Sequence, residues 1–581
     1  MASSTVSAKM NGRAEEPVSR TIFNQLLSQI KHTIDIHPQA TPRHLRFIDC
    51  ESFLNDSVLR IHEYLKPPTE RYSAISYVWK GLQTLEGSNA KHFNVAGAED
   101  ADPISIDVLR TACLASIAFQ SRLLWLDRLC IFQKDKADKS WQIQNMFDIY
   151  KNAYPCLILP GGLTRLASLS DKTTWIHRSW TLQESVAPTM AMCLFAWNLG
   201  PATSFNYSLG HILELEKGKS AMAHLIDLLN LALVSTGAEL DLHEFPRDVS
   251  GIAEGRFVSP PHIGIESNAN PTRIYLSIRI FGHNTSFNEK MHLALLAQAL
   301  SSDGDLRENA IWRSSFLRTS SYAVDAVFSI MGLFGVTLDP SEYAKTERLQ
   351  PTIKLMQKIL SNGGRANWLT LSERSKLSYE FCLVPKFPET SVSREAFYRR
   401  ARDNREISAA EYLGFNRWWP WKLPKGSMDN EGYFTFRAPA LPLPNLNSSP
   451  AMTDFPKSSN YSELSIELYK DYELVDSLYE GKSQPHRHDD NSANSYAIWV
   501  GTKKPFRASG MNIISLNIPI FMLVYRPTSN DPFFCVGLTS VSDGFVQEQH
   551  FVEREFTVGG FRPGVEGDIE ATYRSEGDYG S

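Results

Sequence analysis

The sequence lacks the features that mark several specialised protein classes. Its seven cysteines are scattered and never spaced C-x-x-C, which argues against a disulfide framework or a zinc module and favours a reducing compartment. No uncharged apolar stretch reaches the length of about 18 residues that a membrane span needs. The first twenty residues also lack the apolar core of a secretory signal. We therefore expect a cytoplasmic protein without a membrane span.

Other absences restrict the possible ligands. The net charge of −5 gives no reason to expect a nucleic-acid partner or an anionic membrane. There is no internal repeat, no G-x-G-x-x-G fingerprint and no P-loop. The stretch 486–490 (HRHDD) contains possible metal ligands, but no further ligands lie nearby in the sequence, so we predict no metal site.

Composition changes along the 581 residues suggest several regions. Residues 1–20 are polar and expected to be disordered. We expect an α/β domain at 40–200, a mostly helical extension at 205–375, a β-rich α+β region at 376–565 and a loose tail at 566–581.

Apolar runs alternate with amphipathic stretches in the α/β region. Buried strands are expected at 73–79, 123–131, 156–160 and 191–197, and helices at 104–119, 138–150 and 175–186, with a further possible helix at 22–34. This alternation predicts crossover connections and a mainly parallel sheet with flanking helices. In the stretch 138–150, the apolar side chains recur at helical spacing and should face the sheet: Ile143, Met146, Phe147 and Tyr150.

Ligands of parallel sheets bind beyond the carboxyl ends of the strands. At these ends we find Trp79-Lys80-Gly81, Asp127-Arg128 and Gly161-Gly162. Lys80 is a possible anion contact, although such lysines are mostly just solvated. Asp127 and Arg128 are candidates for binding a ribose or a phosphate; the alternative is a structural ion pair or a helix cap. A plain turn remains the simpler interpretation of the glycine pair.

Three motifs and a later segment give the chain a more specific character. They read Y72-SAISYVW79, W125-LDRLCIFQ133 continuing into Q142-IQNM146, and R178-SWTLQE184; the later segment runs from Arg318 through Asp325 to Gly332. In type and order these resemble the motifs of the fungal heterokaryon-incompatibility (HET) domain. Phe132 stands where the family usually has asparagine.

This resemblance implies a fold and a role. HET domains are thought to resemble Toll/interleukin-receptor (TIR) domains, which have a flavodoxin-like, mainly parallel sheet, and some TIR domains cleave NAD with a glutamate in a W-x-x-x-E pattern. Trp180 and Glu184 form that pattern here, and i, i+4 spacing places them on one face of a helix. Glu184 is thus the candidate catalytic residue, with NAD as the possible substrate; the ligand-binding candidates are Trp79, Lys80, Gly81, Asp127, Arg128 and Trp180.

The resemblance also implies fungal nonself recognition with growth arrest or cell death. Two mechanisms remain open: an NAD glycohydrolase-like enzyme, and a non-enzymatic signalling module that acts by self-association or by binding an unidentified protein trigger. A diverged family member without an incompatibility role is a third possibility. No cofactor fingerprint or acid–base pair decides between them. For the enzyme, we expect Glu184 to be partly accessible and to share one concavity with Trp79 and Asp127.

Overall fold

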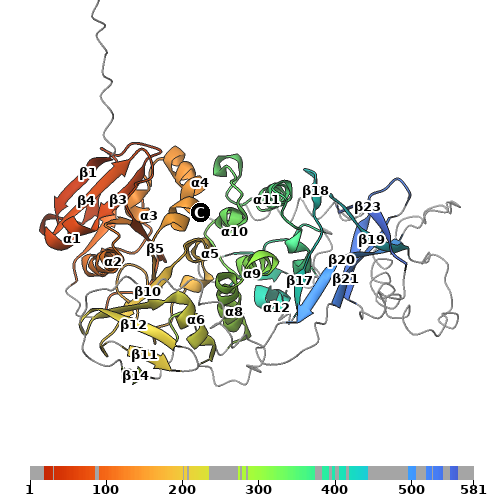
Figure 1. Ribbon diagram of the computed structural model, residues 1–581. Coiled ribbons are helices and arrows are strands. Elements are labelled where there is room, and N and C mark those ends of the chain that lie inside the picture. The colour runs from red at the N-terminus through yellow and green to blue at the C-terminus, as the bar shows by residue number, and fades with distance from the viewer. Residues whose placement is uncertain are drawn as a thin grey trace, which may run out of the picture.

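The computed structural model of the chain shows three regions that follow one another along its long axis: a large sheet with its helices, a helical middle and a β-rich end (Figure 1). The described residues are 19–30, 32–85, 90–200, 202–205, 209–234, 272–274, 278–282, 286–372, 383–390, 395–399, 405–413, 418–442, 495–505, 518–526, 528–540 and 550–559. Residues 1–18 of the stretch 1–20 that was expected to be disordered, the loose tail 566–581 and the 486–490 stretch lie outside these ranges. None of the helices in the described ranges combines the length and the apolar character needed to cross a bilayer.

The large sheet is mixed, with a parallel centre. In spatial order its strands are β1 (Ser19–Leu26), β4 (Val58–Tyr64), β3 (Leu45–Asp49), β8 (Leu123–Trp125), β5 (Tyr72–Tyr77), β9 (Cys156–Leu159), β10 (Ala191–Ala196), β13 (Ser220–His224), β12 (Leu209–Glu216), β11 (Ala202–Phe205) and β14 (Thr272–Ile274). The four central strands, β8, β5, β9 and β10, run parallel. Antiparallel pairs join β3 to β8 on one side and β13 to β10 on the other. The strands expected at 73–79, 123–131 and 156–160 thus lie side by side at the parallel centre of one sheet.

Helices connect and cover these strands. They are α1 (Cys50–Asn55), α2 (Ile106–Ala118), α3 (Asp127–Cys130), α4 (Lys136–Asn152), the 3-10 turns η1 (Leu27–Gln29) and η2 (Trp175–His177), and α5 (Trp180–Val186). Polar side chains set where they begin: Ser105 caps α2 by accepting from the Val108 amide, and the Asp135 carboxylate accepts from the Asp138 amide at the start of α4. A small sheet of β2 (Thr33–Ile34), β6 (His92–Val95) and β7 (Ile104–Ser105) completes this region.

Three expectations for this region were wrong. Residues 19–26 form an edge strand that pairs along its length with β4, whereas disorder was expected up to residue 20 and a helix at 22–34. The strand expected at 123–131 ends at Trp125, and Asp127 to Cys130 form the helical turn α3. Residues 209–216 and 220–224, which we assigned to the helical extension, are strands of the main sheet.

The buried face of α4 is rotated from the predicted one. Met146 and Tyr150 are buried as expected, and Gln142 and Ile149 complete the face. Ile143 and Phe147 are only partly buried. The Phe147 side chain lies against Gly332, where a Cβ atom would come within 2.3 Å of the phenylalanine Cβ. The apolar positions of α4 therefore serve two neighbours, the sheet and the helical middle.

A buried charge network ties α4 to the edge of the sheet. Asp138 on α4 and Arg46 on β3 are both fully buried, and the Arg46 Nη1 donates to the Asp138 carboxylate at 3.0 Å. The Arg46 Nε lies 3.2 Å from the carboxylate of Glu63 on β4. Arg46 also donates to the Cys130 carbonyl at 2.9 Å. One guanidinium thus links two strands with the end of α3 and the first turn of α4.

The helical middle and the β-rich end follow the sheet. The middle comprises α6 (Leu225–Val234), α8 (Phe287–Ser301), α9 (Gly304–Leu317), α10 (Asp325–Met331), η4 (Gly332–Phe334), η5 (Pro340–Glu342), α11 (Leu349–Ser361) and η6 (Asn367–Ser372). The end comprises β15 (Phe397–Arg399), β16 (Glu406–Ser408), α12 (Ala409–Leu413), β17 (Trp418–Trp421), β18 (Gly426–Met428), β19 (Phe434–Pro442), β20 (Ser495–Pro505), β21 (Ile518–Tyr525), β22 (Phe534–Ser540) and β23 (Val552–Val558). Strands β17 to β23 form one antiparallel sheet apart from the main one. The expected β-rich C-terminal region is confirmed.

Candidate functional site

Glu184 lies at the carboxyl end of β5. Its Oε2 accepts a hydrogen bond of 2.5 Å from the hydroxyl of Ser76, a residue of β5. The same hydroxyl oxygen accepts from the indole N–H of Trp175 at 2.9 Å. Strand β5 and the two short helices η2 and α5 therefore hold Glu184 through a chain of three side chains. Of Ser76, Trp175 and Glu184, the sequence analysis named only Glu184 as a candidate site residue.

The environment of Glu184 favours its neutral form. Only 9% of the residue is exposed. Burial raises the pKa of Glu184 to about 8, and the charge of Asp127 adds to that rise, whereas the Ser76 hydrogen bond and the guanidinium groups of Arg318 and Arg178 act in the opposite direction. A carboxyl with such a pKa exchanges its proton near neutral pH. Displaced pKa values of this kind are common at functional sites.

The expected partial accessibility of Glu184 was wrong. The carboxyl is buried, but no ion pair with Arg178 neutralises it within the described residues. The Arg178 Nη1 has no partner there, and its Nη2 lies 3.5 Å from the Ser321 hydroxyl. In the described structure a substrate therefore cannot reach the Glu184 carboxyl, although no salt bridge with Arg178 holds that carboxyl.

Asp127 forms a second cluster. Its carboxylate accepts from the Tyr77 hydroxyl at 2.5 Å, from the Trp79 indole N–H at 2.9 Å and from the Arg128 amide at 2.6 Å. Three donors on one carboxylate hold the end of β5 to the start of α3. These contacts give Asp127 a structural role, although not the expected helix cap, because Leu126 is the N-cap of α3 and no side chain caps that end.

The two carboxyls lie on opposite faces of the sheet. Ser76 and Tyr77 are consecutive residues of β5, so their side chains point to opposite sides. Glu184 is bound through the first and Asp127 through the second. The structure thus brings Trp79 and Asp127 into contact, whereas Glu184 is held by Ser76, and Asp127 acts on it only through its charge.

The remaining candidates at the strand ends pack against backbone. A Cβ atom on Gly81 would come within 2.1 Å of the Gly161 carbonyl oxygen, so only glycine fits there. The Gly81 amide donates to the Asp102 carboxylate at 2.7 Å. Arg128 is fully buried and donates to the Asp102 carbonyl. Lys80 is exposed. Apart from Lys80, these residues build a tight junction between two turns.

The segment that follows α9 docks directly onto the third motif. The Ser179 amide donates to the Thr319 carbonyl at 2.9 Å, and the Thr319 amide donates to the His177 carbonyl at 2.6 Å. The Trp180 indole hydrogen-bonds to Asp325 at the start of α10. Figure 1 shows α10 and α9 lying beside α5, between the sheet and the C-terminal region. Trp180 therefore faces the helical middle and not an open pocket.

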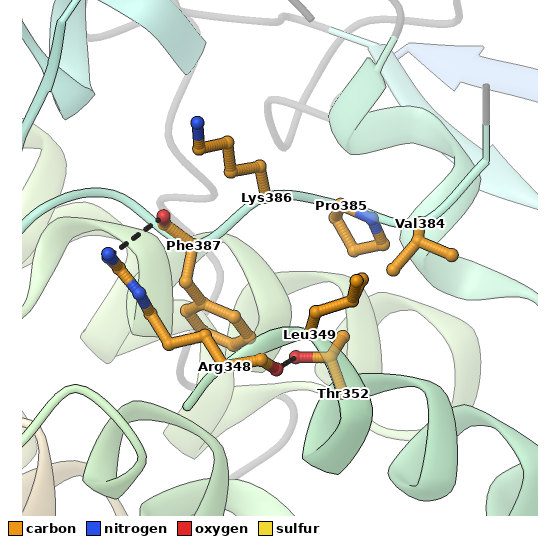
Figure 2. Close-up of a pocket in the computed structure, with 7 residues that line it drawn as sticks. All are labelled: Arg348, Leu349, Thr352, Val384, Pro385, Lys386 and Phe387. Carbon is orange, nitrogen blue, oxygen red and sulfur yellow. Dashed lines mark hydrogen bonds between the residues drawn. The ribbon is translucent and has the colours of Figure 1, made fainter. Parts of the chain in front are cut away.

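A small, shallow hollow lies elsewhere, at the start of α11. Figure 2 shows the Arg348 guanidinium turned toward the Phe387 carbonyl, and the Thr352 hydroxyl bonded to the Arg348 carbonyl. Its wall is otherwise mostly apolar, and it contains none of the motif residues. We assign no function to it. In the described ranges, no three side chains of His, Cys, Asp or Glu gather as a metal site.

Comparison with known proteins agrees with the first two motifs. Residues 72–171, which run from β5 to the loop beyond β9, match the family described as heterokaryon incompatibility protein (HET). This chain therefore carries a HET domain at these residues. Over 129 residues it is 30% identical to "Heterokaryon incompatibility protein 6, OR allele" of Neurospora crassa. That match covers 20% of this chain and 19% of the relative, so it spans about a fifth of either protein. No solved structure matches the HET-domain protein.

Proposed function

We propose that this HET-domain protein acts in fungal nonself recognition and induces growth arrest or cell death, and that its HET domain is a TIR-like unit that cleaves NAD at Glu184. The observation that carries the enzymatic part is the buried Glu184 carboxyl, held by Ser76 at the carboxyl end of a central parallel strand. Ligands of parallel sheets bind at that edge. The incompatibility role rests on the family match and on the relative from Neurospora crassa.

The chemistry needs only water as a co-reactant. The bond between ribose C1′ and the nicotinamide nitrogen breaks, and nicotinamide leaves with the electron pair. An ionised Glu184 stabilises the positive charge that develops on the ribose, as carboxylates do in glycosidases. Water then adds to C1′ and releases a proton, giving ADP-ribose. Because the pKa of Glu184 is about 8, the ionised fraction and the cleavage rate rise with pH through that value.

A non-enzymatic signalling module is the second candidate. The observation that favours it is the 9% exposure of Glu184, since a substrate reaches this carboxyl only after α5 or its cover moves. In this alternative the protein acts by self-association or by binding a protein trigger, and Glu184 serves stability alone.

One experiment separates the candidates. The full-length chain is expressed in fungal cells as wild type, as Glu184→Gln and as Glu70→Gln, an exposed carboxylate of the same region. NAD content and colony growth are measured together. The enzymatic proposal expects NAD loss and growth arrest with wild type and Glu70→Gln only. Growth arrest with unchanged NAD in all three supports the module, and normal growth in all three contradicts the incompatibility role.

A further inference from the structure

Arg318 and Glu184 both lie beyond residues 72–171, which match the HET family, and Arg318 contacts the helix that carries Glu184. It follows the last residue of α9 and is fully buried. Its Nη1 donates to the Thr181 hydroxyl at 2.7 Å and to the Arg178 carbonyl at 3.0 Å. Its Nε donates to Ser314 of its own helix at 3.1 Å. The guanidinium thus joins the end of α9 to the first turn of α5.

This contact places a positive charge beside Glu184. Thr181 and Glu184 are three residues apart on α5, so their Cβ atoms lie about 5–6 Å from each other on one face of the helix. Arg318, bonded to the Thr181 hydroxyl, is therefore about one helical turn from the Glu184 carboxyl. Its Nη2 has no hydrogen-bond partner among the described residues.

A buried cation without an ion pair needs a compensating negative charge. In the described part of the chain Arg318 forms no direct ion pair, and Glu184 is the acidic residue whose charge acts on it. Burial lowers the pKa of Arg318 to about 9, and the Glu184 charge opposes that change. The two groups therefore favour each other's charged forms across the helix interface.

We infer that Arg318 is a positioning residue of the HET site, which holds α5 in place and stabilises the ionised form of Glu184. This inference rests on the proposed role of Glu184 as the reacting carboxylate. It extends the functional unit beyond the residues 40–200 that we expected for the HET domain, because the charge partner comes from the far end of α9. A chain cut at residue 200 would lack it.

Several other groups share this environment. The charges that act on Glu184 come from Asp127 on α3, from Arg178 between η2 and α5, and from Arg318. In turn, the Glu184 charge contributes to the raised pKa values of Tyr77 on β5, Tyr150 on α4 and Cys156 on β9. Arg318 and Arg178 are thus the two cations among these groups, and only Arg318 also donates to a side chain of α5.

The test is an infrared titration of Glu184 in the full-length chain. The carboxyl band of Glu184 is isolated as the difference between each protein and the same protein carrying Glu184→Gln, over pH 6 to about 10. In wild type the midpoint is expected at about 8. Arg318→Gln should move it upward by roughly one pH unit or more, the usual effect of losing an opposite charge nearby. Arg318→Lys retains the positive charge, so its Glu184 midpoint should lie close to that of wild type.

The matched control is Arg307→Gln. Arg307 is also on α9 and donates to α5, to the Val186 carbonyl at 2.9 Å, but its charge is not among those that act on Glu184. This variant should leave the midpoint unchanged. If Arg318→Gln leaves the midpoint where it is in wild type, or if Arg307→Gln moves it equally, the inference is wrong.

A second variant tests the same contact if the Arg318→Gln protein does not fold. Thr181→Val removes the hydroxyl that accepts from Arg318 while the guanidinium remains, and it should also raise the midpoint. The titration does not depend on catalysis. If Arg318→Gln raises the Glu184 midpoint but the Glu184→Gln protein still causes NAD loss, only the proposed function is overturned. If NAD loss requires Glu184 but the Glu184 midpoint is the same in wild type and Arg318→Gln, only this inference is overturned.

Discussion

Removing the charge of Asp138 should destabilise the sheet region strongly. The fully buried carboxylate accepts from Arg46 at 3.0 and 3.2 Å, from the Arg43 amide at 2.6 Å and from the Phe132 amide at 2.9 Å. Asp138→Asn leaves the Arg46 cation buried with only Glu63 as its counter-charge. Breaking a buried pair in this way costs about 3–5 kcal/mol. We expect a loss of about 3 kcal/mol, because Glu63 still compensates part of the charge.

Hydrogen exchange in the amides of β3 and α4 measures this loss locally, which matters in a chain of several regions. The matched control is Asp148→Asn, which removes the same charge from the exposed side of α4 and should change stability by less than about 0.5 kcal/mol. Adding Arg46→Met to Asp138→Asn removes the uncompensated cation and should recover part of the loss. Equal exchange rates in the Asp138→Asn and Asp148→Asn proteins would refute the reasoning.

Three further predictions concern packing and pH. Met146→Ala should cost about 2–4 kcal/mol in denaturant unfolding, because the side chain is buried; a change below about 0.5 kcal/mol would mean that α4 does not pack as described. Gly332→Ala should cost about 1–3 kcal/mol through its clash with the Phe147 side chain, and Phe147→Gly in the same chain should relieve that clash because it also removes the Phe147 Cβ; additive losses would contradict it. In the fold the pKa of Glu184 is about 8, against an ordinary 4.5. The neutral carboxyl therefore contributes stability that is fully present below pH 4.5 and is lost as the pH rises through 8. Glu184→Gln should thus gain about 4–5 kcal/mol over wild type between pH 4 and pH 9, and parallel stability profiles would exclude this linkage.

The central strands could be predicted because parallel strands buried on both faces are continuous apolar runs, as at β5 and β9. The W-x-x-x-E residues were correctly placed on one helix, α5. The end of β8 could not be predicted, since Leu126, Leu129 and Cys130 continue the apolar run into the buried turn α3. An apolar run alone does not distinguish a strand from a short buried helix.

The residues around Glu184 were only partly predictable. Ser76 reads as one more small residue in a buried strand, and Trp175 as an aromatic side chain near a helix start, so nothing local marks either as a partner of the glutamate. Arg318 belongs to a segment that was noted for its resemblance to the family. Its contact with Thr181 depends on the path of the chain across 137 residues, which local patterns do not encode.

The long sequence separation between Thr181 and Arg318 also affects the order of events during synthesis. The chain between them must be translated before the guanidinium can reach α5, and at about 5–20 residues per second this takes roughly 7–27 s. During that interval the nascent chain carries all three HET motifs without the arginine beside Glu184. Under the proposed function, the site would therefore be complete only once residue 318 has been made.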